Sequence, residues 1–281
     1  MAAYSLEKWA KTIQTVSPTA LLDVRHLVAF VLGKSIHEIG LYTSLNSEQE
    51  AQLRRYIKRR SEGEPVAYII GQWDFYGLTL QLNQHTLIPR PETEQLVDAV
   101  LANDSLDPTR LLEVVDLGTG SGAIALALAS QRPQWSFTAI DDDSVALACA
   151  QENFRLQPWQ HDAVRFMCKD WCQWQDVATQ FDLIVANPPY IAPDDSHIMA
   201  EVSQFEPHKA LFSTDNGLHD IRVIINWSIA NLGDGGWLYL EHGFDQASEV
   251  VRYAKAMGLT DVTSYKDYSG HDRFISARLF R

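Results

Sequence analysis

The feature that most constrains this chain is the alternation of short apolar runs with longer amphipathic segments between residues 90 and 281. Such runs predict strands buried on both faces of a sheet, and the segments between them predict helices. The runs are Leu111–Val115, Trp135–Ile140, Val164–Met167, Phe181–Ala186 and Trp237–Leu240. Two further runs, Val262–Tyr265 and Arg273–Leu279, are too close together for an intervening helix and predict an antiparallel edge pair. We therefore expect a Rossmann-like α/β fold, with a mostly parallel sheet covered by helices on both faces.

Two regions precede this alternating part. Residues 1–64 carry apolar side chains at three- and four-residue steps, beginning with Leu6, Trp9 and Ile13, and predict a small helical domain without strands. Gly33 indicates a helix end, and the sequence Ser47–Glu50 indicates a capping box. Residues 65–89 are rich in β-branched and aromatic residues and predict a β-hairpin linker. Residues 90–281 would then form the catalytic domain.

Composition excludes several classes of protein. With 46% hydrophobic and 21% charged residues, the chain is typical of globular proteins and unlike disordered ones. Its longest uncharged apolar stretch, near Ala123–Ala129, is far shorter than the ~20 residues that span a membrane. The absence of a visible secretory signal and the three cysteines favour a reduced, cytoplasmic protein. Cys168 and Cys172 have no second Cys/His pair nearby, so we expect no metal site.

The negative charge is concentrated in the larger part of the chain. Residues 1–65 carry nine Lys/Arg and seven Asp/Glu, whereas residues 66–281 carry 14 Lys/Arg and 29 Asp/Glu, a net charge of −15. So acidic a part disfavours general binding to nucleic acid, because phosphate contacts need clustered Lys and Arg. The basic cluster Arg54–Arg60 is either a solvated helix face or a docking surface for an acidic partner.

A glycine-rich loop joins the first predicted strand of the sheet to a helix that starts at Ala123. The loop consists of Gly118, Thr119, Gly120, Ser121 and Gly122. Its glycines allow a ligand to approach the backbone closely, but the spacing also fits dinucleotide-binding loops and does not choose between cofactors. Asp116, just before the glycines, favours a cationic ligand. Asp141, at the end of the next strand, can accept hydrogen bonds from both hydroxyls of a ribose, and Asp143 is expected to cap a helix.

A second motif, Asn187-Pro188-Pro189-Tyr190, directly follows another predicted strand. Two prolines lead the chain rigidly out of the sheet. Methylation of a planar amino group requires that both of its hydrogens be accepted and that its nitrogen be aimed at the methyl donor. The side-chain oxygen of Asn187 and the carbonyl of Pro188 provide two fixed acceptors, and Tyr190 provides a flat wall. The motif therefore predicts methyl transfer that depends on positioning; the alternative is a stiff strand exit without a catalytic role.

Together, these motifs resemble those of S-adenosylmethionine-dependent amino-group methyltransferases. Asn-Pro-Pro-Tyr alone is shared by enzymes that act on adenine, on guanine in ribosomal RNA and on protein glutamine. The segment Leu87–Glu94, LIPRPETE, with GEPVAYIIGQWDFYGL before it, is similar to the signature of the HemK/PrmC family of peptide chain release factor glutamine methyltransferases. The further matches are Asp170-Trp171, Glu241-His242-Gly243 and Gly270–Arg273.

This resemblance implies a methyltransferase fold with S-adenosylmethionine as the cofactor and no metal. It implies that the methyl acceptor is the side-chain amide nitrogen of a glutamine in class-1 release factors, in their Gly-Gly-Gln motif. Residues 118–122 and Asp141 would hold the cofactor, and Trp171 would lie near its adenine. Asn187 would contact both cofactor and substrate, and the amide would be received by Asn187, Pro188, Pro189 and Tyr190. We expect a monomer that binds no nucleic acid directly, and whose residues 1–64 dock the release factor.

Other interpretations remain open at this point. One is a nucleic-acid amino-group methyltransferase that acts on adenine N6 or guanine N2. Another is a nicotinamide-dependent dehydrogenase, for which the Asn-Pro-Pro-Tyr motif would have no use, and a third is a cofactor-binding adaptor without activity. Arg90 and Glu92 either form an ion pair that shapes the pocket or contact the substrate. His242 and His271 are interpreted as structural, because no paired nucleophile is evident.

Overall fold

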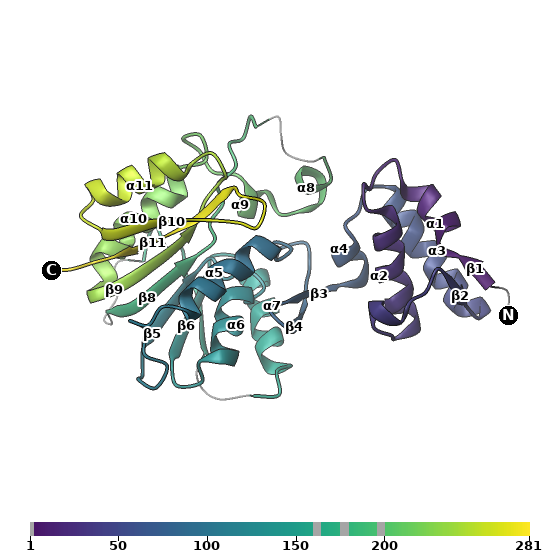
Figure 1. Cartoon of the computed structure of the whole chain (residues 1–281), viewed down its shortest axis with the longest axis horizontal. Helices are drawn as coiled ribbons and strands as arrows, with labels where there is room; N and C mark the ends of the chain where they lie inside the picture. Colours follow the sequence, from purple (N-terminus) through teal and green to yellow (C-terminus); the bar gives the residue numbers. More distant parts are fainter. Residues whose placement is uncertain (1–2, 160–163, 175–179, 196–199) are drawn as a thin grey trace. The chain divides into compact units, whose positions relative to one another are not determined.

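The computed structural model describes residues 3–159, 164–174, 180–195 and 200–281. The chain divides into two compact units (Figure 1). The first contains Met1–Gln72 together with Met199–Phe205, and the second contains Trp73–Ile198 together with Glu206–Arg281.

The first unit is mainly helical. Its helices are α1 (Leu6–Ile13), α2 (Ala20–Leu32), the 3₁₀ helix η1 (Ile36–Glu38), α3 (Ser47–Ser61), α4 (Val66–Ile70) and α8 (Ala200–Phe205). Leu6, Ile13, Leu27 and Leu53 are fully buried in its core, which the apolar spacing of the sequence predicts. Gly33 ends α2 in the left-handed conformation with φ of 63°, which confirms the predicted helix end.

Two details of the first unit differ from the predictions. Strands β1 (Ala3–Ser5) and β2 (Tyr42–Ser44) form a small antiparallel sheet, although no strand was expected before residue 65. Three-residue strands are too short to show an alternating pattern. The capping box of α3 is also shifted by one residue: the Asn46 side chain accepts from the Gln49 amide at 2.8 Å, and the Gln49 side chain accepts from the Asn46 amide at 3.0 Å.

The predicted linker 65–89 is partly helical. Strands β3 (Gln72–Phe75) and β4 (Leu78–Gln81) form a two-stranded sheet joined by Tyr76-Gly77, both with positive φ. The expectation of a strand is wrong for residues 66–70, which form the single helical turn α4. Pro65 precedes this turn and Gly71 ends it in the left-handed conformation, so the two ends decide the structure against the β propensity of the residues between them.

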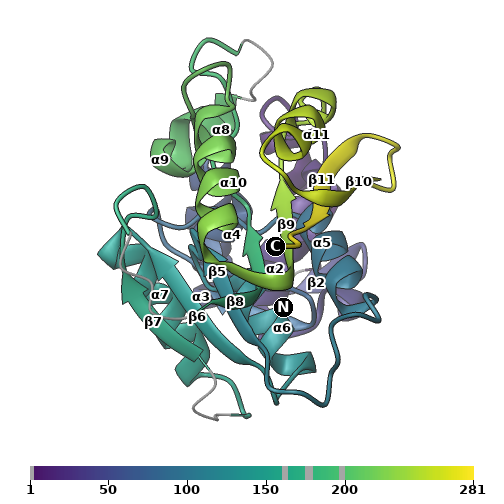
Figure 2. The ribbon, with the colours of Figure 1, turned by 90° about the vertical axis from the view of Figure 1, so that its left-hand side faces the viewer.

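A seven-stranded sheet forms the centre of the second unit, in the order β10-β11-β9-β8-β5-β6-β7 (Figure 2). The parallel strands are β5 (Glu113–Leu117), β6 (Ser136–Asp141), β7 (Val164–Cys168), β8 (Phe181–Ala186) and β9 (Leu232–Glu241). Strands β10 (Thr260–Lys266) and β11 (Asp272–Arg278) add an antiparallel edge. The structure thus confirms the predicted fold class and the antiparallel edge pair.

Helices cover both faces of this sheet (Figure 1). One apolar cluster joins the sheet to α5 (Pro91–Leu101) and α6 (Ala123–Gln131), and the opposite cluster joins it to α10 (His219–Asn231) and α11 (Ala247–Ala256). Two further helices of this unit are α7 (Ser144–Arg155) and the short α9 (His208–Leu211). The connection from β5 runs to β6 on one side, and the connection from its neighbour β8 runs to β9 on the other, so the strand order reverses between β5 and β8. This is the switch point where open α/β sheets bind ligands.

Candidate active site

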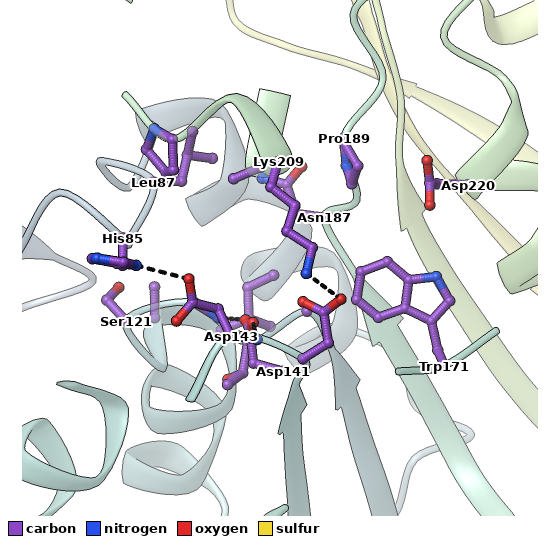
Figure 3. A pocket seen from close by; sticks show the side chains of 18 of the residues that line it. His85, Leu87, Ser121, Asp141, Asp143, Trp171, Asn187, Pro189, Lys209 and Asp220 are labelled. Carbon is purple, nitrogen blue, oxygen red and sulfur yellow. Dashed lines mark hydrogen bonds and ion pairs between the residues drawn. The ribbon is translucent and has the colours of Figure 1, made fainter. Parts of the chain in front are cut away.

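A cavity of about 320 Å³ lies at the carboxyl ends of β5, β6 and β8 (Figure 3). Residues from seven separate segments of the second unit converge on it. They include His85, Leu87, Pro89, Thr93, Gly118–Ser121, Asp141–Asp143, Asp170–Cys172, Asn187, Pro189, Pro207, Lys209 and Asp220. In Figure 3, His85 and Trp171 lie on opposite sides of the cavity, with Asp141 between them.

The glycine-rich loop forms the floor of this cavity. Gly118, Gly120 and Gly122 all have positive φ, at 75°, 56° and 86°. A Cβ atom on Gly118 would lie 3.3 Å from the indole of Trp171, so glycine lets this ring approach the backbone. Gly118 to Ser121 line the cavity, whereas Gly122 lies behind it at the start of α6.

Asp116 stabilises the loop from beneath. It is buried, and its Oδ2 atom accepts from the Thr119 hydroxyl at 2.7 Å and from the Ala125 amide at 3.2 Å. Burial raises the pKa of Asp116 to about 7. The carboxyl group does not line the cavity. These contacts show that the carboxyl group of Asp116 shapes the turn, and they leave the prediction that it favours a cationic ligand untested.

Asp141 lies at the end of β6 and faces the cavity. Its Oδ2 accepts from the Gly120 amide at 2.8 Å, and its Oδ1 accepts from the Asp143 amide at 2.9 Å. Each oxygen thus keeps a second lone pair for a ligand. Burial raises the pKa of Asp141, and the charges of Asp142 and Asp143 add to this effect. The predicted helix cap is confirmed, because Asp143 accepts from the amides of Val145 and Ala146.

Two basic side chains pair with the acids beside Asp141. The Lys209 ammonium lies 2.5 Å from Asp142, and His85 Nδ1 lies 2.8 Å from Asp143 (Figure 3). Sequence reasoning missed both residues. Lys209 comes from α9 and His85 from the segment after β4, and no local pattern connects either residue with the acids.

Asn187 is oriented by a hydrogen bond from its side-chain amide. Its Nδ2 donates to the Thr93 hydroxyl at 3.2 Å. Its Oδ1 is buried and has no hydrogen-bond partner among the described residues. Asn187 is a residue of the cavity wall, so its oxygen is a buried acceptor without a donor beside the cavity.

The other residues of the Asn-Pro-Pro-Tyr motif divide between the cavity and the protein interior. Pro189 lines the cavity, whereas the side chains of Pro188 and Tyr190 do not. The Tyr190 hydroxyl donates to Glu241 at 3.1 Å, and the Tyr190 carbonyl accepts from Gln246 at 2.9 Å. The motif is thus fixed from behind at its last residue, and the role of Tyr190 as a substrate wall remains a prediction.

Arg90 forms an ion pair, as one of our two interpretations expected, but its partner is not Glu92. The Arg90 guanidinium lies 2.5 Å from Glu206, whose side chain is buried and also accepts from the Ile88 amide at 3.2 Å. This ion pair joins residues 88–90 to the segment that leads into α9. His242 is buried and hydrogen-bonded to the Gly243 carbonyl.

Part of the basic cluster Arg54–Arg60 on α3 forms ion pairs within the protein and is not free to bind a partner. Arg60 is buried, with its guanidinium 2.7 Å from Asp23 and 2.9 Å from Glu201. Arg59 lies 2.5 Å from Glu64. Arg55 and Lys58 are exposed. Within the described residues, no helix is long and apolar enough to cross a membrane, and no group of three His, Cys, Asp or Glu could hold a metal.

Two models of protein families match this chain. Residues 96–213 match the model of the methyltransferase small domain, and residues 5–71 match that of the PrmC N-terminal domain. The fold resembles the crystal structure of a methyltransferase from Pyrococcus furiosus, with a TM-score of 0.54 and 14% identity over 84% of this chain and all of that one. The fold and the site therefore define a methyltransferase.

The relatives specify the family. A release factor glutamine methyltransferase from Coxiella burnetii is 41% identical over 96% of this chain and 95% of its own length. The proteins of the same name from Vibrio cholerae and Pseudomonas aeruginosa are 41% and 42% identical over 92% of this chain and 90% and 92% of their own lengths. This chain belongs to the family of release factor glutamine methyltransferases.

Proposed function

We propose that this protein transfers a methyl group from S-adenosylmethionine to the side-chain amide nitrogen of a glutamine in class-1 peptide chain release factors, in their Gly-Gly-Gln motif. The observation that carries this proposal is the unpaired Oδ1 of Asn187, a buried acceptor on the cavity at the switch point of the sheet. A primary amide has the N–H donor that this acceptor lacks.

The cavity fits S-adenosylmethionine, which is the methyl donor of this class. When bound, the cofactor supplies an electrophilic methyl group on a positively charged sulfur. Asp141 would hold its ribose through the lone pairs that the loop amides leave free, and Trp171 would pack against its adenine. The carboxylates of Asp170 and Asp220 also line the cavity and favour a cation there, whereas the charge of Asp142 is paired with Lys209. Asp116 would contribute by shaping the loop.

Asn187 would direct the reaction by holding the substrate amide. Its Oδ1 accepts one hydrogen of the glutamine NH₂, and the carbonyl of Pro188 accepts the other, so the nitrogen faces the methyl group. The cofactor would supply the methyl group, and the amide nitrogen would then give up one proton to water, because a protonated amide is strongly acidic. Catalysis then arises from orientation within a rigid loop.

The family assignment decides against the nicotinamide dehydrogenase. We also propose that the first unit docks a second region of the release factor. In support, the exposed basic residues Arg55 and Lys58 lie on α3 of this unit. Arg59 and Arg60 are engaged within the protein, and the exposed Arg54 pairs with Glu50, which leaves Arg55 and Lys58 for that role.

The test compares protein and RNA as methyl acceptors. The purified chain is incubated with labelled S-adenosylmethionine and, in separate reactions, with a class-1 release factor, ribosomal RNA or DNA. The proposal predicts label in the release factor alone. Label in nucleic acid with none in the release factor would contradict it, and binding without transfer to any acceptor would indicate an adaptor. Replacing Arg55 and Lys58 by Glu should raise KM for the intact factor and leave a short glutamine peptide unaffected.

A further inference from the structure

A buried carboxyl group lies directly behind the acceptor that would receive the substrate. Glu241, the last residue of β9, is 1% exposed. Its Oε2 accepts from the Thr93 hydroxyl at 2.7 Å, and its Oε1 accepts from the Tyr190 hydroxyl at 3.1 Å. Thr93 in turn receives the hydrogen bond from Asn187. Glu241 thus connects to both ends of the Asn-Pro-Pro-Tyr motif.

Asn187, Thr93 and Glu241 form a series of two hydrogen bonds, and the carboxylate of Glu241 fixes the direction of both. An ionised carboxylate has no hydrogen to donate, so the Thr93 hydroxyl must turn its proton toward Glu241. The Thr93 oxygen can then only accept from its other neighbour, which is the side chain of Asn187. Asn187 must therefore turn its NH₂ group toward Thr93 at 3.2 Å, and its oxygen away from Thr93.

We propose that Thr93 and Glu241 are positioning residues, which set the orientation of the Asn187 amide so that its oxygen meets the substrate. This inference rests on the proposed function. With the amide turned by 180°, Asn187 would present NH₂ to the NH₂ of the glutamine, and two donors would face each other. Such a pairing costs free energy because neither donor has an acceptor. The two hydrogen bonds that orient Asn187 therefore determine whether the substrate amide binds in the reactive orientation.

The direction of these hydrogen bonds depends on whether Glu241 is ionised. Burial raises the pKa of Glu241 to about 7. The hydrogen bonds from Thr93 and Tyr190 oppose this rise, as does the positive charge of Arg273, from β11. The negative charge of Glu92, from α5, adds to it. The Tyr190 hydroxyl also faces the carboxylate, and burial lowers the pKa of the neighbouring His242, which keeps that ring neutral. When Glu241 is protonated, it can donate a hydrogen bond to Thr93, and the Thr93 hydroxyl can then donate to the oxygen of a reversed Asn187 amide.

Three variants and one control variant separate positioning from mere packing. Thr93→Val keeps the shape of the side chain and removes the hydroxyl, whereas Thr93→Ser keeps the hydroxyl. We expect Thr93→Val to lower kcat by about 10²-fold, with the Kd for S-adenosylmethionine unchanged, and Thr93→Ser to restore most of the loss. Glu241→Gln should lower kcat similarly, because its NH₂ group can donate to Thr93. Ser228→Ala removes another buried hydroxyl, which donates to the Ile224 carbonyl, and should leave kcat unchanged.

The pH profile provides the second readout. In the wild type, kcat should fall as the pH decreases below about 7, because protonated Glu241 no longer fixes the orientation of the Asn187 amide. Glu241→Gln should lack this decline. Wild-type kcat in Thr93→Val, or equal losses in Thr93→Val and Thr93→Ser, would overturn the proposal. So would a pH profile that Glu241→Gln leaves unaltered.

A measurement without substrate distinguishes this inference from the proposed function. In nuclear magnetic resonance spectra, the Asn187 NH₂ protons, assigned by their loss in Asn187→Asp, should exchange slowly with water in the wild type and in Thr93→Ser, and quickly in Thr93→Val. If this pattern holds but no release factor is methylated, the proposed function fails and the orientation of Asn187 remains. If methylation occurs but the NH₂ protons exchange equally in all three proteins, the inference fails alone.

Discussion

The most informative cofactor variant is Asp141→Ala, because the carboxylate has both structural and proposed ligand contacts. The substitution removes the acceptor of the Gly120 and Asp143 amides, at 2.8 and 2.9 Å. It would also remove two hydrogen bonds to the ribose, each worth roughly 1.5–3 kcal/mol when the acceptor is charged. Asp141 is only partly buried, so water recovers about half of this loss. We therefore expect the Kd for S-adenosylmethionine to rise roughly 10- to 150-fold.

Isothermal titration calorimetry measures this change, and Asp143→Ser is the matched control. Serine caps a helix about as well as aspartate, so the control removes a neighbouring cavity charge and keeps the start of α7. Its Kd should stay within about threefold of the wild type. An unchanged Kd in Asp141→Ala would place the ribose elsewhere. Equal weakening in both variants would show that the negative charge of the cavity matters, and not the hydrogen bonds of Asp141.

Three further predictions concern the scaffold. Burial raises the pKa of Asp116 to about 7, so the folded state retains a proton that the unfolded state releases, and stability should fall from pH 5 to pH 8. In urea unfolding, the loss of unfolding free energy between pH 5 and pH 8 should be smaller in Asp116→Asn than in the wild type by roughly 2–4 kcal/mol. Equal losses in the two proteins would contradict this prediction. Gly217→Ala places a Cβ 2.0 Å from the Tyr190 carbonyl and should lower kcat, whereas Gly258→Ala, with similar backbone strain and open space, should not. Arg60→Met leaves two carboxylates unpaired and should destabilise the first unit by about 3–5 kcal/mol; a loss below about 1 kcal/mol would refute this.

The parts of the site that the sequence predicts are those with local causes. A strand that ends in glycines before a helix defines the loop 118–122, and an acid at the end of the next strand defines Asp141. Both follow from the rule that ligands bind at the carboxyl ends of parallel strands. Asn187 is predictable for the same reason, because two prolines after it force the chain out of the sheet. The resemblance to a known family then selected the cofactor and substrate among several chemistries.

The parts that the sequence does not predict depend on segments distant along the chain. Lys209 follows Asp142 by 67 positions, and no pattern indicates that they pair. The link from Glu241 to Thr93 spans 148 positions. The sequence also does not show that Asp116 faces the turn, because a strand-end acid can face either a ligand or the turn itself, and only its burial decides between them.

The central claim is that Asn187 directs a methyl group onto a glutamine amide nitrogen. Its most direct test is tandem mass spectrometry of a class-1 release factor after reaction with S-adenosylmethionine and either the wild-type protein or Asn187→Ala. Our account predicts that the wild type adds one methyl group to the side-chain nitrogen of the glutamine in the Gly-Gly-Gln motif. It also predicts that Asn187→Ala binds the cofactor but loses on the order of 10²-fold or more in turnover. A methyl group on any other residue, or wild-type turnover by Asn187→Ala, would contradict the account.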